Sequence, residues 1–342
     1  MPRQSNSLCS APQIGATGGA WHRRMLVWTA DDGRKLRFMY QPIITTLRLA
    51  AQAASPTVDF HEGTCFVEKG YGHIYGGSAA FGPILAWTRP GDLFIWIGQT
   101  THNVPFQALA AAGALTVHYF PDAIGHVRQS CASNANETWT YTWRNIDTCR
   151  EDKKSKGHTW RLIPPGAHPQ PGAVNASLFS PLVFLGKVDS IRKWCWQRMQ
   201  RQQGMQPHRE NMKYNYSVWD AATLRSVLEQ HSVFLSMHKS CNSPASFQEP
   251  FEAFRASTLL SAGALMICEL SYPKDRAMYD GMVSHTALLA VGDEYSRLRS
   301  LLPEERRKLS AKRQGRFQST FDPVAIFARA GVYDLLRGLP FR

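Results

Sequence analysis

Acidic and basic side chains gather in one stretch of the second half of the chain, residues 246–269, SFQEPFEAFRASTLLSAGALMICE. Glu249, Glu252 and Arg255 stand near the start of an expected helix, and Glu269 closes the apolar run that follows it. Carboxylates accept hydrogen bonds from sugar or ribose hydroxyls, and a guanidinium binds phosphate oxygens in pairs. The stretch is therefore a candidate site for a phosphorylated ligand that carries hydroxyl groups.

A structural interpretation of the same residues stays open. Acidic side chains near a helix start stabilise the positive end of the helix dipole. Glu252 and Arg255 also have the i,i+3 spacing of a surface ion pair. Under this interpretation the charges support the helix alone and bind no ligand.

Helix and strand signals in the stretch would position these side chains. Ser246 and Glu249 have the spacing of a capping box, which predicts a helix start at this point. Gly263 is typical of a helix end in the left-handed conformation. Ala264–Cys268 is a continuous apolar run, as expected for a parallel strand covered on both faces. Glu269 then lies at the carboxyl end of a strand, where open α/β sheets bind ligands.

The segment from His238 to Glu269 resembles the donor-binding part of GT-B glycosyltransferases, in particular the glycosyltransferase family 1-like, CgeB-like C-terminal domain. In that family a helix with an acidic start, followed by a glycine and an apolar run ending in Glu, holds a nucleotide sugar. The subgroup's helix carries E-x-x-R, as Glu252–Arg255 does here. The common form has a second glutamate, and near that place this chain has Thr258.

The resemblance implies an α/β fold of two Rossmann-like domains facing across a cleft, each a parallel sheet flanked by helices. The alternation of strand and helix signals in the second half also favours a doubly wound parallel sheet. The expected parts are a disordered N-terminus (1–22), an N-terminal acceptor domain (23–165), a linker (166–180), a C-terminal nucleotide-sugar domain (181–322) and a C-terminal helix (323–342).

The resemblance also implies which residues hold the donor. Gly186 and Lys187 follow the first strand of the second domain, where glycine allows a phosphate to approach and a basic residue adds charge. The residues implied for donor binding are Gly186, Lys187, Arg192, His238, Glu249, Glu252, Arg255 and Glu269. Two structural alternatives stay open, namely a helix that happens to start with basic residues and a hydrogen-bonded structural histidine at 238.

The first half contains a β-loop-α-β unit, with strands expected at Asp92–Ile97 and Ala114–Tyr119. His102 lies in the loop after the first of these strands, and Asp122 follows the second. Both positions are at carboxyl ends of strands, so either side chain is a candidate catalytic base for an acceptor hydroxyl. The alternatives are a solvated loop histidine and an aspartate that caps the next helix.

Two further strands are expected. Glu137–Asp147 alternates aromatic and polar residues, with Trp139, Tyr141 and Trp143 on one face. Thr286–Val291 is a short run after the main motif.

The net charge of +13 over 342 residues favours anionic partners. A nucleotide-diphosphate sugar fits this charge together with the motif, and a stable complex with nucleic acid is the less favoured alternative. No obvious D-x-D metal motif is present, so the expected transfer uses no metal and no cofactor besides the nucleotide-sugar co-substrate. The acceptor is unknown.

Seven cysteines, without a C-x-x-C pair, argue against a zinc site and suit a reducing compartment. Cys195 and Cys268 are expected in the core. No run is apolar enough for a transmembrane segment and no signal peptide is clear, so a cytoplasmic location is favoured and the secretory pathway stays open. Three N-x-S/T sequons begin at Asn136, Asn175 and Asn215 and are uninformative without a secretory signal.

Overall fold

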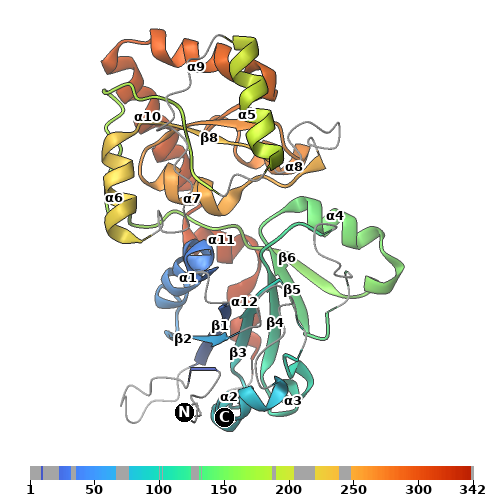
Figure 1. Cartoon of the computed structure of the whole chain (residues 1–342). Helices are drawn as coiled ribbons and strands as arrows, with labels where there is room; N and C mark the ends of the chain where they lie inside the picture. The colour runs from blue at the N-terminus through green and yellow to red at the C-terminus, as the bar shows by residue number, and fades with distance from the viewer. Residues whose placement is uncertain are drawn as a thin grey trace, which may run out of the picture. The chain divides into compact units, whose positions relative to one another are not determined.

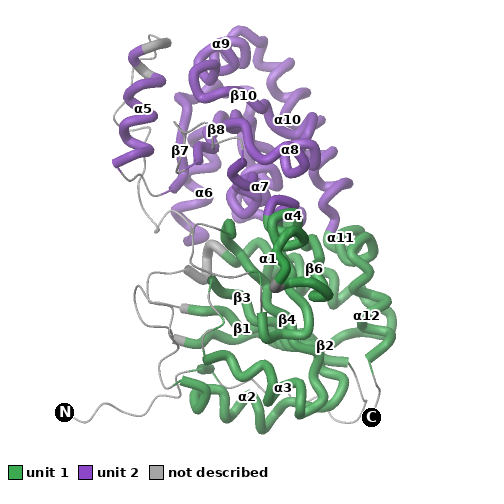
Figure 2. Tube along the Cα trace, turned by 90° about the vertical axis from the view of Figure 1, so that its right-hand side faces the viewer, with its two compact units in different colours: residues 1–141, 145–164, 323–342 green, residues 142–144, 165–322 purple. Residues whose placement is uncertain are grey.

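The computed structural model describes residues 9–10, 23–31, 36–66, 77–99, 101, 103–124, 131, 133–186, 190–203, 220–238 and 248–339. The chain divides into two compact units, which Figure 2 colours separately. Unit 1 contains residues 1–141, 145–164 and 323–342, and unit 2 contains residues 142–144 and 165–322. Each unit is built on a parallel sheet of its own.

The sheet of unit 1 has six parallel strands in the order β2-β1-β3-β4-β5-β6 (Figure 1). They are β1 (Arg23–Asp31), β2 (Val58–Phe66), β3 (Leu93–Ile97), β4 (Leu115–Phe120), β5 (Glu137–Thr140) and β6 (Thr159–Leu162). Because β2 and β3 flank β1 on opposite sides, the carboxyl ends of β1 and β3 form the point where strand order reverses. Ligands of α/β sheets bind at such points.

Helices cover this sheet, and the last two come from the end of the chain. They are α1 (Leu36–Gln52), α2 (Gly82–Trp87), α3 (Phe106–Ala111), α4 (Trp143–Glu151), α11 (Pro323–Arg329) and α12 (Val332–Gly338), with short 3-10 helices η1 (Gly77–Phe81) and η2 (Lys153–Ser155). Phe327 packs edge-on against Trp139 with ring centroids 6.3 Å apart. The Tyr333 hydroxyl donates to the Ala50 carbonyl at 3.0 Å. The C-terminal helices therefore complete the core of unit 1.

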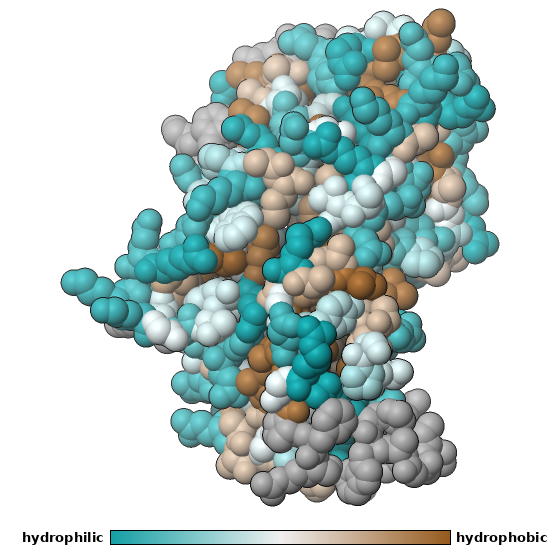
Figure 3. Space-filling model, turned by 180° about the vertical axis from the view of Figure 1, so that it is seen from behind, coloured by the Kyte–Doolittle hydropathy of each residue, from teal (hydrophilic) through white to brown (hydrophobic). Residues whose placement is uncertain are grey.

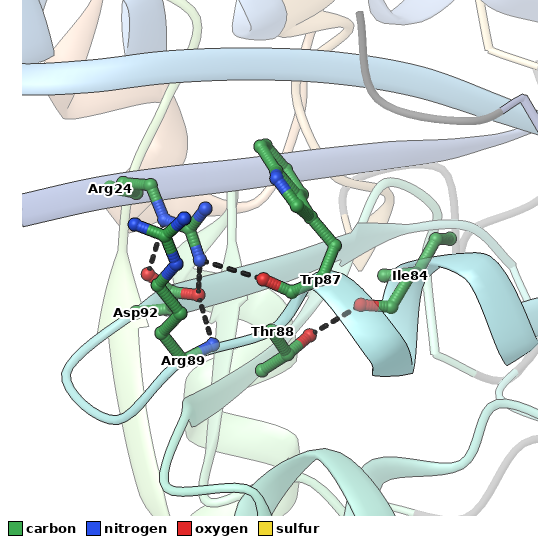
Figure 4. Close-up of polar contacts among 6 residues, drawn as sticks. All are labelled: Arg24, Ile84, Trp87, Thr88, Arg89 and Asp92. Carbon is green, nitrogen blue, oxygen red and sulfur yellow. Dashed lines mark hydrogen bonds and ion pairs between the residues drawn. The ribbon is translucent and has the colours of Figure 1, made fainter. Parts of the chain in front are cut away.

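A buried ion pair joins β1 to the turn before β3, at the amino-terminal edge of this sheet (Figure 4). Arg24 donates from Nε to Asp92 Oδ1 at 2.9 Å and from Nη2 to Asp92 Oδ2 at 2.6 Å. Its Nη2 also donates to the Trp87 carbonyl at 2.9 Å, and the guanidinium lies 4.3 Å from the centroid of the Trp87 ring. The Arg89 amide donates to Asp92 Oδ2 at 2.7 Å. This bidentate geometry holds both charges in a nearly solvent-free position.

Disulfides link Cys9 to Cys65 and Cys131 to Cys149, and Cys195 is disulfide-bonded as well. These pairs were not predicted from the sequence, because wide spacing along the sequence does not report distance in the fold. Cys195 is buried in the core as expected, although it is oxidised. Cys268 is free and buried, which confirms its prediction as a core residue.

The sheet of unit 2 has four parallel strands in the order β10-β9-β8-β7. They are β7 (Val183–Phe184), β8 (Val233–Ser236), β9 (Leu265–Glu269) and β10 (Ser284–Thr286). The helices are α5 (Ser190–Gln203), α6 (Ala221–Gln230), α7 (Ala253–Ser261), α8 (Pro273–Met278), α9 (Val291–Ser300) and α10 (Pro303–Thr320), with the 3-10 helix η6 (Leu288–Ala290). All five residues of β9 are buried, as predicted from its apolar run. The two parallel sheets with flanking helices confirm the predicted α/β class.

The helix of the acidic motif starts later than predicted. α7 begins at Ala253, with Glu252 at the N-cap and Glu249 outside the helix, while Ser246 lies outside the described residues. Glu249 precedes Pro250, and a residue before proline is disfavoured in the helical conformation. Its carbonyl instead accepts a hydrogen bond from the Tyr272 amide at 2.7 Å. The helix end is as predicted, with Gly263 at φ +83°.

The strand expected over Glu137–Asp147 is wrong in its second half, because β5 ends at Thr140 and α4 begins at Trp143. Asp275 stabilises that helix start, since its Oδ1 accepts from the Trp143 amide at 2.6 Å and its Oδ2 accepts from the Thr142 hydroxyl. A cap supplied from such a distance along the chain leaves no local signal. The strand expected at Thr286–Val291 is also wrong, because β10 ends at Thr286 and η6 and α9 follow.

No helix in the described part of the chain is long and apolar enough to cross a membrane. On the face seen in Figure 3, hydrophilic residues predominate and hydrophobic residues form small groups between them.

Candidate functional site

The carboxyl ends of β7, β8 and β9 bring several of the predicted residues to one edge of the unit 2 sheet. Gly186 follows β7, His238 follows β8, and Glu269 is the last residue of β9. Because the three strands are parallel neighbours, these positions share the edge at which α/β sheets bind ligands.

Glu269 and His238 contact each other at this edge. The His238 amide donates to Glu269 Oε2 at 3.0 Å, and both residues are buried. Nε2 of His238 lies 3.1 Å from the Leu270 carbonyl, which accepts only, so Nε2 carries the proton and Nδ1 is the acceptor of the neutral ring. Burial lowers the pKa of His238, while the carboxylates of Glu252 and Glu249 act in the opposite direction. The histidine thus contributes a neutral, oriented ring.

Two arginines stack on one aromatic ring beside these residues. The guanidinium of Arg255, on α7, lies 4.9 Å from the centroid of the Phe184 ring. The guanidinium of Arg192, on α5, lies 5.4 Å from the same centroid. Glu252 is close to both, with Oε1 at 3.4 Å from Arg192 Nη2 and Oε2 at 3.7 Å from Arg255 Nη2. Two guanidinium groups therefore share the Glu252 carboxylate.

The Arg255 side chain is only partly hydrogen-bonded. It is 11% exposed, and its Nε and Nη1 are buried without a hydrogen-bond partner in the part of the chain that the structure describes. Burial lowers the pKa of Arg255, as expected when a cation loses its hydration. Its contact with Glu252 at 3.7 Å is too long for a good hydrogen bond. The side chain consequently offers unused donors at the carboxyl edge of the sheet.

Gly186 is required by the close approach of this arginine. A Cβ built at Gly186 would lie 2.9 Å from Arg255 Nη2 and 3.1 Å from a ring carbon of Phe184. Any larger residue would push against the guanidinium and the ring together. Glycine at this position avoids a clash with the guanidinium and the ring.

Of the other predicted site residues, some lie in the part of the chain that the structure describes and some do not. Glu249 is buried next to this edge. Lys187 and His102 lie outside the described residues. Thr258, at the place of the second glutamate of the motif, is buried within α7, where its hydroxyl reaches the Phe254 carbonyl at 3.5 Å.

Asp122 lies in unit 1, after the carboxyl end of β4, and is half-buried. Its Oδ2 accepts from Gln99 Nε2 at 2.7 Å and its Oδ1 accepts from the Ala123 amide at 2.8 Å. Residues 125–130, over which a helix capped by Asp122 would extend, lie outside the described residues.

Sequence reasoning missed two residues near the strand ends. Phe184 supports both arginines, and its signal was an aromatic residue directly before the Leu185-Gly186 pair. His118 in β4 is buried, with Nε2 at 2.9 Å from the Gly98 carbonyl, and burial lowers its pKa to about 4. Its apolar neighbours indicated a buried strand, so His118 was not considered as a functional residue.

Among the described residues, no group of three or more His, Cys, Asp or Glu side chains is arranged to hold a metal ion.

No family model and no curated protein matches this chain. The likeness is to solved structures. An alpha,alpha-trehalose-phosphate synthase (UDP-forming) from Burkholderia vietnamiensis is 12% identical, with a TM-score of 0.57 over 92% of this chain and 100% of the other. An alpha,alpha-trehalose 6-phosphate synthase from Burkholderia multivorans is 13% identical, with a TM-score of 0.53 over 92% and 98%. The apo structure of OtsA is 10% identical, with a TM-score of 0.56 over 93% and 100%.

These matches extend over nearly the whole of each chain, and together with the two parallel sheets they show the GT-B glycosyltransferase fold. The predicted fold is therefore confirmed. At this level of identity the likeness concerns the fold, and the chemistry has to be argued from the residues themselves.

Proposed function

We propose that this chain is a glycosyltransferase that moves a sugar from a nucleotide-diphosphate sugar to an acceptor hydroxyl. Its fold is that of glycosyltransferases, and the name of one similar protein gives UDP as a product. UDP-sugars are accordingly the first donors to test. The proposal includes transfer without a metal ion, with the leaving diphosphate stabilised by basic side chains and helix N-termini.

The observation that supports the donor site best is the incompletely bonded Arg255. A buried guanidinium with unused donors is costly unless a ligand completes its hydrogen bonds. Arg192 adds a second cation over the same Phe184 ring, and Gly186, which has no side chain, lies close to Arg255. A diphosphate carries the charge and the acceptor oxygens that this arrangement lacks.

The remaining residues have roles that follow from their chemistry. Glu252 is 34% exposed, so its carboxylate can accept from a ribose or sugar hydroxyl while it separates the two arginines. Glu269 accepts from the His238 amide through Oε2, and its carboxylate at the carboxyl end of β9 is a further proposed contact for a donor hydroxyl. His238 presents a neutral ring to the sugar or the phosphate. Glu249 and Lys187 are further proposed donor contacts.

The acceptor hydroxyl needs a base, for which His102 and Asp122 remain the two proposed residues. Asp122 already accepts hydrogen bonds from Gln99 and the Ala123 amide, which favours a positioning role. An activity profile against pH for Asp122→Asn would separate a base, whose loss abolishes turnover, from a positioning residue, whose loss leaves the profile's shape unchanged.

Two other functions are distinguished by specific observations. A non-catalytic nucleotide- or sugar-binding protein of the same fold is favoured by Thr258 at the place of the second glutamate. A nucleic-acid-binding protein is favoured only by the net charge of +13.

The test is calorimetric titration of the purified chain with UDP, GDP and their sugar conjugates, followed by measurement of nucleotide release from the donor that binds. Binding with release of the nucleotide supports the transferase. Binding without release, across a panel of acceptors, supports the non-catalytic alternative. No nucleotide binding, with nucleic-acid affinity that falls steeply with salt, would overturn the donor site and support the third function.

A further inference from the structure

One of the three N-x-S/T sequons is displayed in a form that suits modification. Asn175 is exposed in the segment that leads into β7. Its Oδ1 accepts from the Ser177 amide at 3.1 Å, and its carbonyl accepts from the Leu178 amide at 3.1 Å. The sequon therefore forms an Asx turn. No described residue accepts a hydrogen bond from the Asn175 side-chain amide, which leaves its nitrogen on the surface.

A buried arginine donates hydrogen bonds to the backbone of this turn. Arg306, on α10, donates from Nε to the Ala176 carbonyl at 3.3 Å and from Nη2 to the Ser177 carbonyl at 2.8 Å. Its guanidinium also lies 5.3 Å from the centroid of the Phe179 ring. The backbone of the turn is thus fixed to unit 2, while the Asn175 side chain points outside that network.

The turn lies at the edge of the unit 2 sheet opposite the proposed donor site. The Val174 amide donates to the carbonyl of Ala262, which precedes β9. The Ser180 hydroxyl accepts from the amide of Ser232, which precedes β8, at 2.8 Å. Residues 174–180 therefore run along the amino-terminal ends of these strands. A bulky group on Asn175 would leave the carboxyl-terminal edge of the sheet accessible.

The sequon at Asn136 provides a contrast within the same chain. Its Oδ1 accepts from both the amide and the hydroxyl of Thr116, each at 2.8 Å. Thr138, the hydroxyl residue of this sequon, is 1% exposed in β5 and is bonded to His158 Nε2 at 2.8 Å. This sequon is built into the sheet of unit 1 and is not available as a free turn. The sequon at Asn215 lies outside the described residues.

The disulfides give an independent indication of the compartment. Cys9–Cys65 and Cys131–Cys149 are both in unit 1, and Cys195 is oxidised in unit 2. Structural disulfides form and persist in oxidising environments such as the endoplasmic reticulum and the cell exterior, and they are rare in a reducing cytosol. Transfer of glycans to N-x-S/T sequons belongs to the same class of environment, since acceptor sequons are found in surface loops of secreted proteins.

We propose that Asn175 is an N-glycosylation acceptor and that the chain matures in an oxidising secretory compartment. The co-reactant is an oligosaccharide bound through a diphosphate to a lipid. The Asn175 side-chain nitrogen forms a bond to the anomeric carbon, the bond from that carbon to the diphosphate oxygen breaks, and the lipid diphosphate leaves with the electron pair. One amide proton passes to a base of the host transferase. This inference is independent of the donor site and goes beyond the proposed function.

The test is production of the full chain behind a secretion leader in cultured insect cells, followed by peptide mapping before and after treatment with peptide N-glycosidase. We expect a glycan on the peptide that contains Asn175. Asn175→Gln and Ser177→Ala should each lose the mass of one glycan, and Ser177→Thr should keep it. Asn136→Gln is the matched control and should leave the glycan mass unchanged.

Non-reducing digests of the same material report the disulfides. Linked peptides for Cys9–Cys65 and Cys131–Cys149 together with an occupied Asn175 support the proposal. An unmodified Asn175 peptide in disulfide-bonded protein overturns the modification, and free thiols at these four cysteines overturn the compartment. Cell-free translation with microsomal membranes measures the same Asn175 peptide when a variant is poorly secreted. UDP binding by the glycosylated chain tests the donor site separately.

Discussion

Arg24 in unit 1 and Arg255 in unit 2 are both buried arginines stacked on an aromatic ring, and they differ in how completely they are bonded. Arg24 makes a bidentate pair with Asp92 and a third hydrogen bond to a carbonyl. Arg255 has a carboxylate at 3.7 Å, and two of its nitrogens are without partners among the described residues. The first arginine is held by three hydrogen bonds, whereas we propose that a ligand completes the hydrogen bonds of the second.

The location of each arginine in its sheet agrees with this difference. Arg24 lies near the amino end of β1, where ligands of parallel sheets do not bind, and Arg255 lies by the carboxyl ends of β7 and β9. A buried ion pair whose hydrogen-bond donors all have partners stabilises the folded state. A buried arginine with unpaired donors lowers the free energy of unfolding, and a bound ligand can restore that stability. Burial and an aromatic neighbour alone therefore do not identify a functional arginine, but its hydrogen-bond inventory does.

The largest effect is expected from removing the partner of Arg24. Asp92→Ala leaves a buried cation unpaired and should lower the free energy of unfolding by about 3–5 kcal/mol. Asp334→Ala is the control, because it breaks an exposed pair with Arg337 and should cost less than about 1 kcal/mol. Urea unfolding monitored by tryptophan fluorescence compares the two. Equal losses for both variants would show that the Arg24 pair is not a special stabilising contact.

A second expected effect concerns buried histidines and acid. Burial lowers the pKa of His118 from 6.5 to about 4, so the unfolded chain binds a proton before the folded chain does. The stability from this group is complete above pH 6.5 and is lost as the pH falls towards the folded pKa of about 4, by roughly 3 kcal/mol. His118→Gln keeps a donor for the Gly98 carbonyl and cannot titrate.

The free energy of unfolding is measured over about three pH units, from pH 7 down to 4. It should fall less steeply for His118→Gln than for the unchanged chain. His238→Gln is the comparison in unit 2. The carboxylates of Glu252 and Glu249 oppose the burial effect at His238, so its removal should flatten the profile less. A steeper profile for His118→Gln would contradict the assignment of a neutral buried ring.

Local patterns predicted the elements whose signals lie within the element itself. Helix α6 (Ala221–Gln230) is of this kind, since its N-cap Asp220 and its apolar positions are all local. The buried run of β9 and the left-handed Gly263 were predicted for the same reason. The alternation of strand and helix signals predicted a parallel α/β sheet in the second half, and the family resemblance implied two such domains.

The features that were missed depend on contacts between distant parts of the sequence. Asp275 stabilises the start of α4. The Tyr272 amide donates a hydrogen bond to the Glu249 carbonyl, which lies outside α7. Disulfide pairing is of the same kind, because only the fold brings Cys9 next to Cys65. In the candidate site the charged residues could be named from their types, but the stacking on Phe184 and the unused donors of Arg255 required side-chain geometry.

Removing Arg255, the buried arginine with unpaired donors, should weaken nucleotide binding and leave folding intact. Arg255→Ala deletes charge-assisted hydrogen bonds to a diphosphate and should weaken UDP affinity by about 2 kcal/mol, on the order of 30-fold in Kd. Its unfolding midpoint should be unchanged or higher, because a poorly bonded buried cation is lost. Arg297→Ala removes a half-exposed arginine paired with Glu294 and is the matched control for charge. Titration calorimetry measures both.

This prediction fails when the two variants bind UDP equally, or when Arg255→Ala unfolds like Asp92→Ala. The second outcome would place Arg255 in the same class as Arg24, as a structural cation. Arg255→Lys adds a finer measurement, since an ammonium keeps the charge but loses the planar fork, and it should recover only part of the affinity.

The smallest effect is expected from the ring beneath the two arginines. Phe184→Leu keeps the side chain apolar and of similar size but removes the π face, which contributes about 0.5–2 kcal/mol to a nearby cation. UDP affinity should fall several-fold, because Arg192 and Arg255 lose the surface that orients them. Trp87→Leu makes the same change beneath Arg24 and should lower stability by a similar amount without any effect on UDP. If Phe184→Leu instead lowers stability alone, the ring is a packing residue and the arginines are oriented by Glu252.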